Sequence, residues 1–362
     1  MQKIGILTFQ NAYNYGAVLQ AYALKEVIGS NGEIINYNNN YFRTSEIFLK
    51  DNNDLKRKIL KLIFYRKLKE RINKFHLFQQ LLVDNKPLIE DNELYMLNDT
   101  YDLFITGSDQ VWNLQCSGYK TAYFLDFVQQ TKKKNSYAAS LGSDHISKDN
   151  IQVIQKLLKD FQNISVRETS AKFIVEKLTG RKVPVVLDPT MLLTYDNWDE
   201  LLYNYKIKNK EKNKYILLYT VLNGDKITDY ARRISKKMGL KLYCITSSLH
   251  PQYGMKCIRN AGPLEWLSMV KNAEMIITNS YHGLAFSLIY NKQFYIELLP
   301  PPSQSNARIL DLLEDLKLTD RIINDKNNIN DNAFSYDNIN NIIEKKRQDS
   351  LSFLKVIIND YN

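Results

Sequence analysis

Short apolar segments alternate with helical patterns along almost the whole chain. Residues 3–9 predict a buried strand, residues 16–32 a helix that ends near a glycine, and residues 33–39 the next strand. Strands are also expected at 102–107, 135–142, 163–168 and 183–189, with helices at 149–161 and 169–179. Short apolar strands that alternate with helices are typical of a mostly parallel sheet with both faces covered. The fold class predicted from this pattern is α/β.

A polar, lysine-rich stretch at residues 205–214 interrupts the alternation, which restarts with a strand at 215–221. The second half predicts helices at 225–238, 263–273 and 283–290, and strands at 240–246, 275–278 and 293–299. Because 362 residues are too many for one ordinary core, we expect two Rossmann-like domains that face a central cleft. Their expected bounds are 1–200 and 211–335. A terminal helix within 336–362 would have room to pack back on the N-terminal domain.

The formal charge of +10 comes mostly from residues 56–74, where nine basic residues accompany one acidic residue. The rest of the chain is nearly neutral, so a nucleic-acid-binding face is not expected. Apolar residues at three- and four-residue spacing, from Leu60 to Phe75, predict that this segment is a helix in an insertion at about 54–80. Two interpretations stay open: a core-packed helix with a solvated basic face, or a helix that lies on an anionic membrane surface.

The sequence shows neither a secretory signal nor a membrane span. The start, MQKIGILTF, turns directly into a strand-like run, and no apolar run reaches about 18 residues. The three cysteines, Cys116, Cys244 and Cys257, lack CxxC spacing, so neither a disulfide framework nor a zinc site is expected. We therefore expect a cytoplasmic protein, with peripheral contact at the inner membrane surface under the second interpretation of the basic helix.

Polar residues follow the predicted strands of the N-terminal domain, and in open parallel sheets ligands bind beyond these carboxyl ends. Asn14 and Gly16 stand where a helix begins, which suits either an anion at its N-terminus or a plain tight turn. Asp109 follows the strand at 102–107 and is a candidate base or helix cap. Arg167 ends the strand at 163–168, where its partner is either a carboxylate of the chain or a ligand anion.

The second domain contributes the segment TNSYHG at the end of its strand 275–278. His282 lies there between two apolar runs, at the expected start of a helix. One interpretation is a histidine that caps or packs against this helix. The other is an acid or base, because an imidazole titrates near neutral pH. Strand ends from two facing domains would line one cleft, which predicts a ligand site between them.

Six segments, in this order and at these separations, resemble the polysaccharide pyruvyl transferase family. They are LTFQNAYNYGAVLQAYAL, ITGSDQVWN, YAASLG, SVRE, VLDPTMLL and ITNSYHGLAFSLIYNKQF, and the resemblance extends from about residue 3 to 322. It implies a two-domain GT-B-like fold. It also implies transfer of the pyruvate moiety of phosphoenolpyruvate onto two hydroxyls of a sugar in a cell-surface polysaccharide precursor, which forms a cyclic ketal and releases phosphate.

The resemblance also assigns roles to residues. His282 matches the histidine of the family's second domain, and Arg167 matches a donor-contacting arginine of the first. Well-known members have arginine and leucine immediately before that histidine, where this chain has Ser280 and Tyr281. Arg308, near the start of a helix just beyond the last strand, is our candidate for the missing cation.

The expected site combines these residues with neighbours from the other strand ends. His282 is the expected acid or base, and Asp109 is expected to orient or deprotonate the acceptor hydroxyl. The candidates for donor contact are Arg167, Arg308, Asn14, Gly16 and Ser280, and those for acceptor or secondary contact are His145, His250, Ser140 and Glu168. Neither a metal nor a cofactor beyond phosphoenolpyruvate as co-substrate is expected.

Two other functions remain compatible with the sequence. A GT-B glycosyltransferase that uses a nucleotide sugar would share the architecture, since a fold does not determine its chemistry. An inactive, membrane-associated component of a polysaccharide assembly complex would explain the basic helix and the missing arginine. The acceptor is expected to be a sugar or a lipid-linked oligosaccharide. The sequence does not distinguish galactose from mannose or glucosamine.

Overall fold

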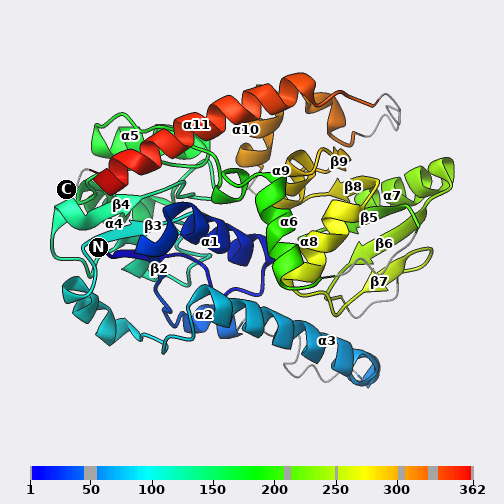
Figure 1. Ribbon diagram of the computed structural model, residues 1–362, viewed down its shortest axis with the longest axis horizontal. Coiled ribbons are helices and arrows are strands. Elements are labelled where there is room, and N and C mark those ends of the chain that lie inside the picture. The colour runs from blue at the N-terminus through cyan, green and yellow to red at the C-terminus, as the bar shows by residue number, and fades with distance from the viewer. Residues whose placement is uncertain are drawn as a thin grey trace.

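The structure is a computed structural model that describes residues 2–44, 55–207, 213–248, 252–300, 306–324 and 333–359, with the backbone alone for 43–44 and 55–62. Two parallel sheets occupy the two ends of the molecule, and helices lie between and around them (Figure 1). The predicted α/β fold class, with two halves that each contain a parallel sheet, is therefore confirmed.

The first sheet has the strand order β2-β1-β3-β4, and all its strands are parallel. The strands are β1 (Ile4–Leu7), β2 (Gly32–Ile34), β3 (Leu103–Thr106) and β4 (Lys134–Ser136), and the helices of this half are α1 (Tyr15–Ile28), α2 (Asn40–Thr44), α3 (Leu55–Leu82), α4 (Lys148–Lys159), α5 (Thr169–Thr179) and α6 (Tyr195–Asn204). In register, Ile4 of β1 pairs with Gly32 and with Leu103. The sequence did not predict α2 or α6.

Two predicted strands of the first half form only isolated bridges. Val166 pairs with Ala139 and with Val185, and no strand is assigned at 163–168 or 183–189. The strand predicted at 135–142 also stops early, at Ser136, because Ala138 has a left-handed φ of 51°. Pro184 cannot donate to a neighbouring strand, and this limits pairing further. The sheet therefore continues beyond β4 as single bridges.

The second sheet has the order β7-β6-β5-β8-β9 and is also fully parallel. Its strands are β5 (Tyr215–Tyr219), β6 (Lys241–Ile245), β7 (Lys256–Ile258), β8 (Met275–Thr278) and β9 (Gln293–Ile296), with helices α7 (Asp225–Met238), α8 (Pro263–Asn272), α9 (Tyr281–Ile289) and α10 (Ala307–Asp315). The strand β7 was not predicted. The remaining elements of this half begin within about two residues of their predicted positions.

The first helix, α1, joins the two halves. It lies at the centre of the molecule, with the second sheet on one side and the first on the other (Figure 1). Tyr15 stacks on Trp266 of α8 at a centroid distance of 5.5 Å, and its hydroxyl donates to the carbonyl of Ala261 at 2.8 Å. Both aromatic side chains are fully buried. The start of α1 is therefore held against the second half.

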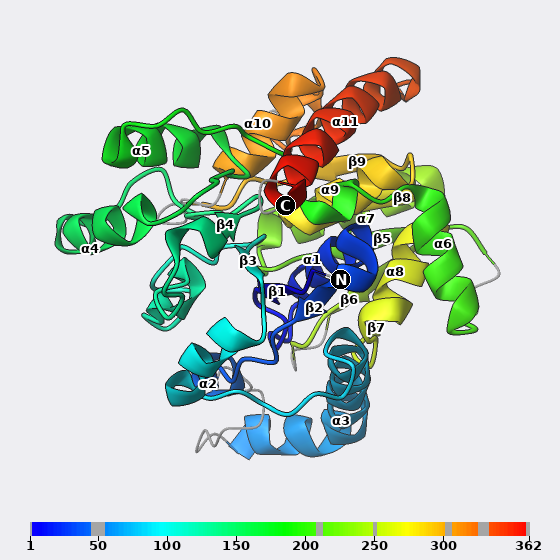
Figure 2. The same cartoon turned by 60° about the vertical axis from the view of Figure 1, so that its left-hand side comes forward.

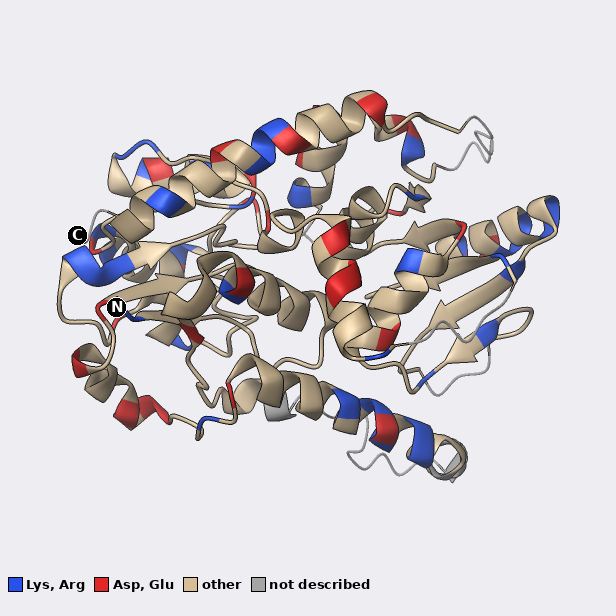
Figure 3. Cartoon of the chain, viewed as in Figure 1, with Lys and Arg blue, Asp and Glu red and all other residues tan. Residues whose placement is uncertain are grey.

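The helix α3 runs along one side of the molecule, opposite α10 and α11 (Figure 2). Leu68, Phe75, Phe78 and Leu82 are buried, while lysines and arginines cover much of the remaining described surface (Figure 3). This distribution agrees with the interpretation of α3 as a helix packed on the core. Nothing in the structure tests contact with a membrane surface. Within the described residues, no helix is long and apolar enough to cross a membrane.

The last helix, α11 (Asp337–Asn359), returns to the first half. The amide of Leu187 donates to the hydroxyl of Ser350 at 3.0 Å, and Nε of Arg347 donates to the carbonyl of Met191 at 2.8 Å. Ile339, Ile343, Leu354 and Ile357 are buried on its inner face. The chain therefore crosses from the first half to the second and back again.

Candidate functional site

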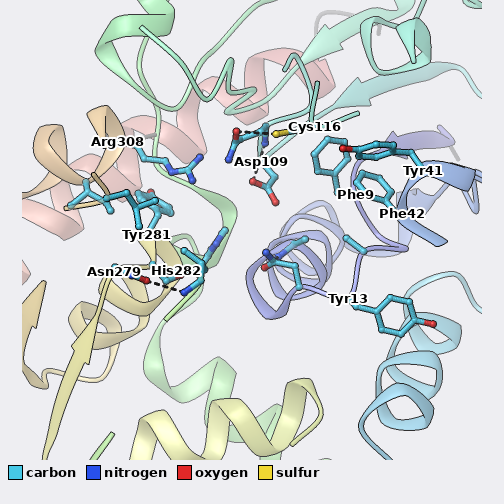
Figure 4. A pocket seen from close by; sticks show the side chains of 18 residues that line it. Phe9, Tyr13, Tyr41, Phe42, Asp109, Cys116, Asn279, Tyr281, His282 and Arg308 are labelled. Carbon is cyan, nitrogen blue, oxygen red and sulfur yellow. Dashed lines mark hydrogen bonds between the residues drawn. The ribbon is translucent and has the colours of Figure 1, made fainter. Parts of the chain in front are cut away.

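A cavity of about 460 Å³ lies where the strand ends of the two sheets meet. Its walls come from the segments after β1, β3, β8 and β9 and from the starts of α1, α9 and α10 (Figure 4). It is lined by Phe9, Ala12, Tyr13, Asn14, Ala17, Tyr41, Phe42, Asp109, Gln110, Cys116, Val221, Asn279, Ser280, Tyr281, His282, Leu299, Arg308 and Ile309. A volume of this size is typical of sites for small molecules, which occupy about 300–1,000 Å³.

A buried charge cluster holds His282 in place. The Nε2 atom of His282 lies 3.5 Å from Oδ2 of Asp188, and the same oxygen accepts a hydrogen bond from Nη1 of Arg167 at 2.8 Å. Oδ1 of Asp188 accepts from the amide and hydroxyl of Thr190. Burial alone would raise the pKa of Asp188, but the neighbouring His282 and Arg167 side chains hold it well below its usual range. Asp188 is therefore an anion that lies beside both His282 and Arg167.

Gly16 allows this imidazole to approach α1. A Cβ atom added at Gly16 would lie 1.9 Å from Nδ1 of His282, so no other residue fits there without moving the ring. The sequence could not show this, because the two residues are far apart in the chain. Gly16 therefore serves the contact between the halves, whereas we predicted it as part of an anion-binding turn.

Two of the helices that begin at the cavity, α1 and α9, have side-chain caps. Asn14 caps α1 by accepting from the amide of Ala17 at 3.2 Å, and Ser280 caps α9 by accepting from the amide of Gly283 at 3.3 Å. Both caps line the cavity. The positive ends of both helix dipoles therefore lie close to any ligand bound there, which favours an anion.

Arg308 reaches into the cavity from the first turn of α10 (Figure 4). No described carboxylate lies within 4.0 Å of its guanidinium, unlike that of Arg167. With the amide of Gln110 turned so that its oxygen faces Arg308, this oxygen lies 3.2 Å from both Nη atoms. Burial and the nearby Arg167 cation lower the pKa of Arg308 below its usual range. The side chain is thus a partly buried cation that a bound anion would neutralise.

The ring of Tyr281 lies close to both arginines. The guanidinium carbon of Arg167 is 4.8 Å from the centre of its ring, and that of Arg308 is 5.6 Å away. Cations attract the face of an aromatic ring over such distances. The ring therefore contacts both Arg167 and Arg308. Tyr281, which stands where well-known family members have leucine, therefore provides an aromatic ring beside the Arg308 guanidinium.

Arg167 lies among three carboxylates of the chain, although its Nε atom makes no hydrogen bond. Besides Asp188, its guanidinium lies 3.5 Å from Oδ1 of Asp109 and 3.8 Å from Oε2 of Glu168, and its side chain is 1% exposed. Burial would lower the pKa of Arg167, but these carboxylates raise it above its usual range. Arg167 does not line the cavity. Arg167 instead lines a smaller adjoining pocket with Tyr281 and Arg308, and the donor contact that the resemblance implies stays a prediction.

Asp109 faces the cavity with a left-handed backbone, at φ 69°. Its Oδ1 atom accepts from the amide of Gln110 at 2.9 Å and lies near Arg167. Left-handed backbone at a residue other than glycine costs about 1 kcal/mol or more and is concentrated at functional sites. This carboxylate is therefore held at the cavity wall rather than used as an ordinary helix cap.

The other predicted contacts are distributed differently. The Ser140 hydroxyl donates to Oε1 of Glu168 at 2.8 Å, and both residues are buried behind the cavity rather than on its wall. His145 is largely exposed, lies 2.9 Å from Oδ1 of Asp144 and does not line the cavity. His250 lies outside the described residues. The described part of the chain contains no cluster of three or more possible metal ligands.

Several residues at this site were not predicted. Asp188 was not among the predicted site residues, although its place directly after an apolar run was a usable signal. Gln110 and Tyr281 are neighbours of predicted residues and follow from the same strand ends. The aromatic wall formed by Phe9, Tyr41 and Phe42 carried no signal, because α2 has no apolar periodicity.

The family model for polysaccharide pyruvyl transferase matches residues 14–296 of the chain. A comparison with curated proteins gave no significant match. Solved structures that resemble the chain include UDP-GlcNAc 2-epimerase from Neisseria meningitidis bound to UDP-GlcNAc, at 10% identity over 100% of this chain and 94% of that chain, with a TM-score of 0.47. E. coli ADP-heptose lps heptosyltransferase II is also similar, at 9% identity, 98% of both chains and a TM-score of 0.37.

Proposed function

The chain belongs to the polysaccharide pyruvyl transferase family, and from this premise we propose that it moves the pyruvate moiety of phosphoenolpyruvate onto two hydroxyls of a sugar. The product would be a cyclic ketal on a polysaccharide precursor, with phosphate released. One observation supports the proposal above the others. Arg308, a cation without a carboxylate partner among the described residues, shares one cavity with His282 and two helix N-termini.

The donor carries a phosphate and a carboxylate, so its site needs several cationic or amide groups. In the proposed pose one anionic group binds Arg308, which gains the counter-ion that it lacks. The other faces the first turns of α1 and α9, capped by Asn14 and Ser280. Arg167 acts indirectly in this pose, because its charge is used to hold Asp188 and Asp109.

Ketal formation begins when the methylene carbon of phosphoenolpyruvate takes a proton. We assign the delivery of this proton to the imidazole ring of His282, whose Nε2 atom lies beside Asp188. The neighbouring carbon then becomes oxocarbenium-like and bonds to the first sugar hydroxyl. Its bond to the bridging phosphate oxygen breaks, phosphate leaves, and the second hydroxyl closes the ring.

The reaction as written balances without a further cofactor. Two hydroxyl protons of the acceptor are lost, while the new methyl group gains one proton and hydrogen phosphate carries the other. A base is needed for the acceptor, and Asp109 is the carboxylate on the cavity wall that is placed for this task. General acid–base groups of this kind contribute about 10²–10⁴ in rate.

Thermal-shift titration with phosphoenolpyruvate tests the donor site directly. Phosphoenolpyruvate at about 100 times its dissociation constant should stabilise the protein by roughly 2.7 kcal/mol, and UDP-glucose and inorganic phosphate serve as comparison ligands. The dissociation constant for phosphoenolpyruvate obtained from this titration should rise at least tenfold in Arg308→Ala. Arg232→Ala, an exposed arginine paired with Asp229, is the matched control and should respond like the wild type.

The outcomes separate the alternatives. A shift with UDP-glucose and none with phosphoenolpyruvate would favour a glycosyltransferase. No shift with either ligand would leave the non-catalytic component as the better explanation. An Arg308→Ala variant that binds phosphoenolpyruvate as tightly as the wild type would remove Arg308 from the donor site.

A further inference from the structure

The wall of the cavity opposite Arg308 and His282 is aromatic. Figure 4 shows Phe9, Tyr41 and Phe42 on one side, Arg308, Tyr281 and His282 on the other, and Asp109 between them. This arrangement divides the cavity into a cationic part and an aromatic part. The proposed donor is a small anion and accounts for only the cationic part.

The phenylalanines of the aromatic part pack against each other and against a buried tyrosine. Phe9 packs edge-on against Phe42 at a centroid distance of 4.7 Å and against the buried Tyr123 at 4.9 Å. Tyr41 is the most exposed of the three side chains: 47% of its surface is accessible to solvent, and it lines the cavity. The cluster therefore presents an aromatic surface backed by core.

Neighbouring residues position Tyr41. Asn39 is buried, accepts from the amide of Tyr41 through Oδ1 at 3.0 Å, and donates through Nδ2 to the carbonyl of Ser117 at 2.9 Å. Gly118, at φ +68°, lies so close that an added Cβ would be 2.6 Å from Cβ of Tyr41. Tyr41 is thus held by contacts from two separate segments of the chain.

A pyranose matches this combination of surfaces. Sugar rings present a flat face of C–H groups that packs on an aromatic ring, while their hydroxyls donate to carboxylates. Asp109 stands at the boundary between the two parts of the cavity and provides such a carboxylate. A nucleotide would instead need cations beside the aromatic wall, and among the described lining residues the only lysine or arginine is Arg308, on the opposite side.

We infer that the aromatic wall is the acceptor subsite, where a neutral hexopyranose stacks on Tyr41 and directs a hydroxyl to Asp109. This inference rests on the proposed function, because it identifies the second substrate of the same site. It makes Tyr41 and Phe42 determinants of acceptor binding that do not contribute to donor binding. The hydroxyl of Tyr41 is not required, since the interaction uses the face of its ring.

Saturation-transfer difference NMR on the full chain tests the inference. The probes are the methyl glycosides of galactose, glucose, mannose and N-acetylglucosamine, each with phosphoenolpyruvate present. At least one should receive saturation at its ring C–H protons. Tyr41→Ala should reduce this signal at least fivefold, and Tyr41→Phe should retain it. Tyr203→Ala, an 82% exposed tyrosine outside the cavity, is the control and should match the wild type.

Three results would overturn the inference. They are equal glycoside signals in Tyr41→Ala and the wild type, no signal from any of the four glycosides, or a Tyr41-dependent signal from UDP-glucose alone. A parallel thermal shift with phosphoenolpyruvate should be the same in Tyr41→Ala as in the wild type, which shows that the variant is folded. If phosphoenolpyruvate does not bind but a glycoside contacts Tyr41, the carbohydrate site stands and the proposed function fails.

Discussion

At the residue scale, Gly16 is the position where the smallest change should have the largest effect. Gly16→Ala adds a methyl group 1.9 Å from Nδ1 of His282 and must displace the imidazole from Asp188. Alanine is otherwise the better helix former, so α1 should persist. We expect phosphate release from phosphoenolpyruvate and acceptor to fall at least a hundredfold. A coupled phosphate assay measures it.

Gly224→Ala provides the comparison. Gly224 is the N-cap residue of α7. A Cβ atom added there would lie 3.5 Å from its nearest neighbouring atom, which is an ordinary van der Waals contact. This variant should keep wild-type activity. Equal activity in Gly16→Ala and Gly224→Ala would mean that the position of the imidazole does not matter for turnover.

Asp188 should make stability depend on acid pH. Its pKa is depressed in the folded state, so its contribution to stability is complete above the unfolded-state pKa of about 3.9 and declines as pH falls toward the folded-state value. Asp188→Asn lacks this contribution and leaves the buried Arg167 with a missing partner, at a cost of about 3–5 kcal/mol. The difference in Tm between wild type and variant should therefore be largest near pH 7 and narrow below pH 4. A gap that is constant with pH would contradict the assignment.

The site residues that could be predicted from the sequence are those that directly follow strands with a clear apolar run. His282 and Asp109 lie at the cavity because TNSYHG and ITGSDQ come immediately after β8 and β3. The pairing of Arg167 could not be decided, because a carboxylate of the chain and a ligand anion satisfy an arginine equally well. Only the position of Asp188, 2.8 Å away, resolves that choice.

At the element scale, α3 fastens the first half to the second. Lys74 forms ion pairs with Glu70 at 3.0 Å and with Glu265 of α8 at 2.8 Å, and donates to the carbonyl of Asn260. Burial would lower the pKa of Lys74, but hydrogen bonds to these carboxylates raise it. Lys74 of this basic helix thus has a structural role that the charge pattern did not indicate.

Lys74→Met should loosen this attachment. The lysine is about a quarter exposed, so we expect a loss of about 1 kcal/mol and faster hydrogen exchange at the start of α8. Lys69→Met, an exposed lysine on the same helix, serves as the control and should leave exchange at α8 unchanged. Hydrogen-exchange mass spectrometry of both variants would measure this. Unchanged exchange in Lys74→Met would show that other contacts hold α3.

Two of the elements that the sequence failed to predict, α2 and β7, are short. The helix α2 has five residues and no apolar stripe, and β7 has three residues of which none is fully buried. Such segments are fixed by their neighbours rather than by their own pattern, as Asn39 and Gly118 fix Tyr41. The aromatic wall of the cavity depends on one of them, so this part of the site was accessible only from the structure.

At the scale of the whole molecule, the two sheets share one core. A single cluster of buried side chains includes Ile4 and Ile105 of the first sheet and Leu217 and Ile276 of the second. The alternation of strands and helices was enough to predict two α/β halves. It could not show that α1 would be enclosed between them, because helix burial depends on packing partners that are distant in sequence.

The return of α11 to the first half means that the halves have two covalent connections. The chain leaves the first half before β5 and comes back before α11. Two bodies joined at one point can rotate about any axis, whereas two points define a single hinge line. The cavity lies between the two bodies and has Arg308 and Asp109 on its wall, so any opening would be a rotation about this one hinge line and would change the distance between these two side chains.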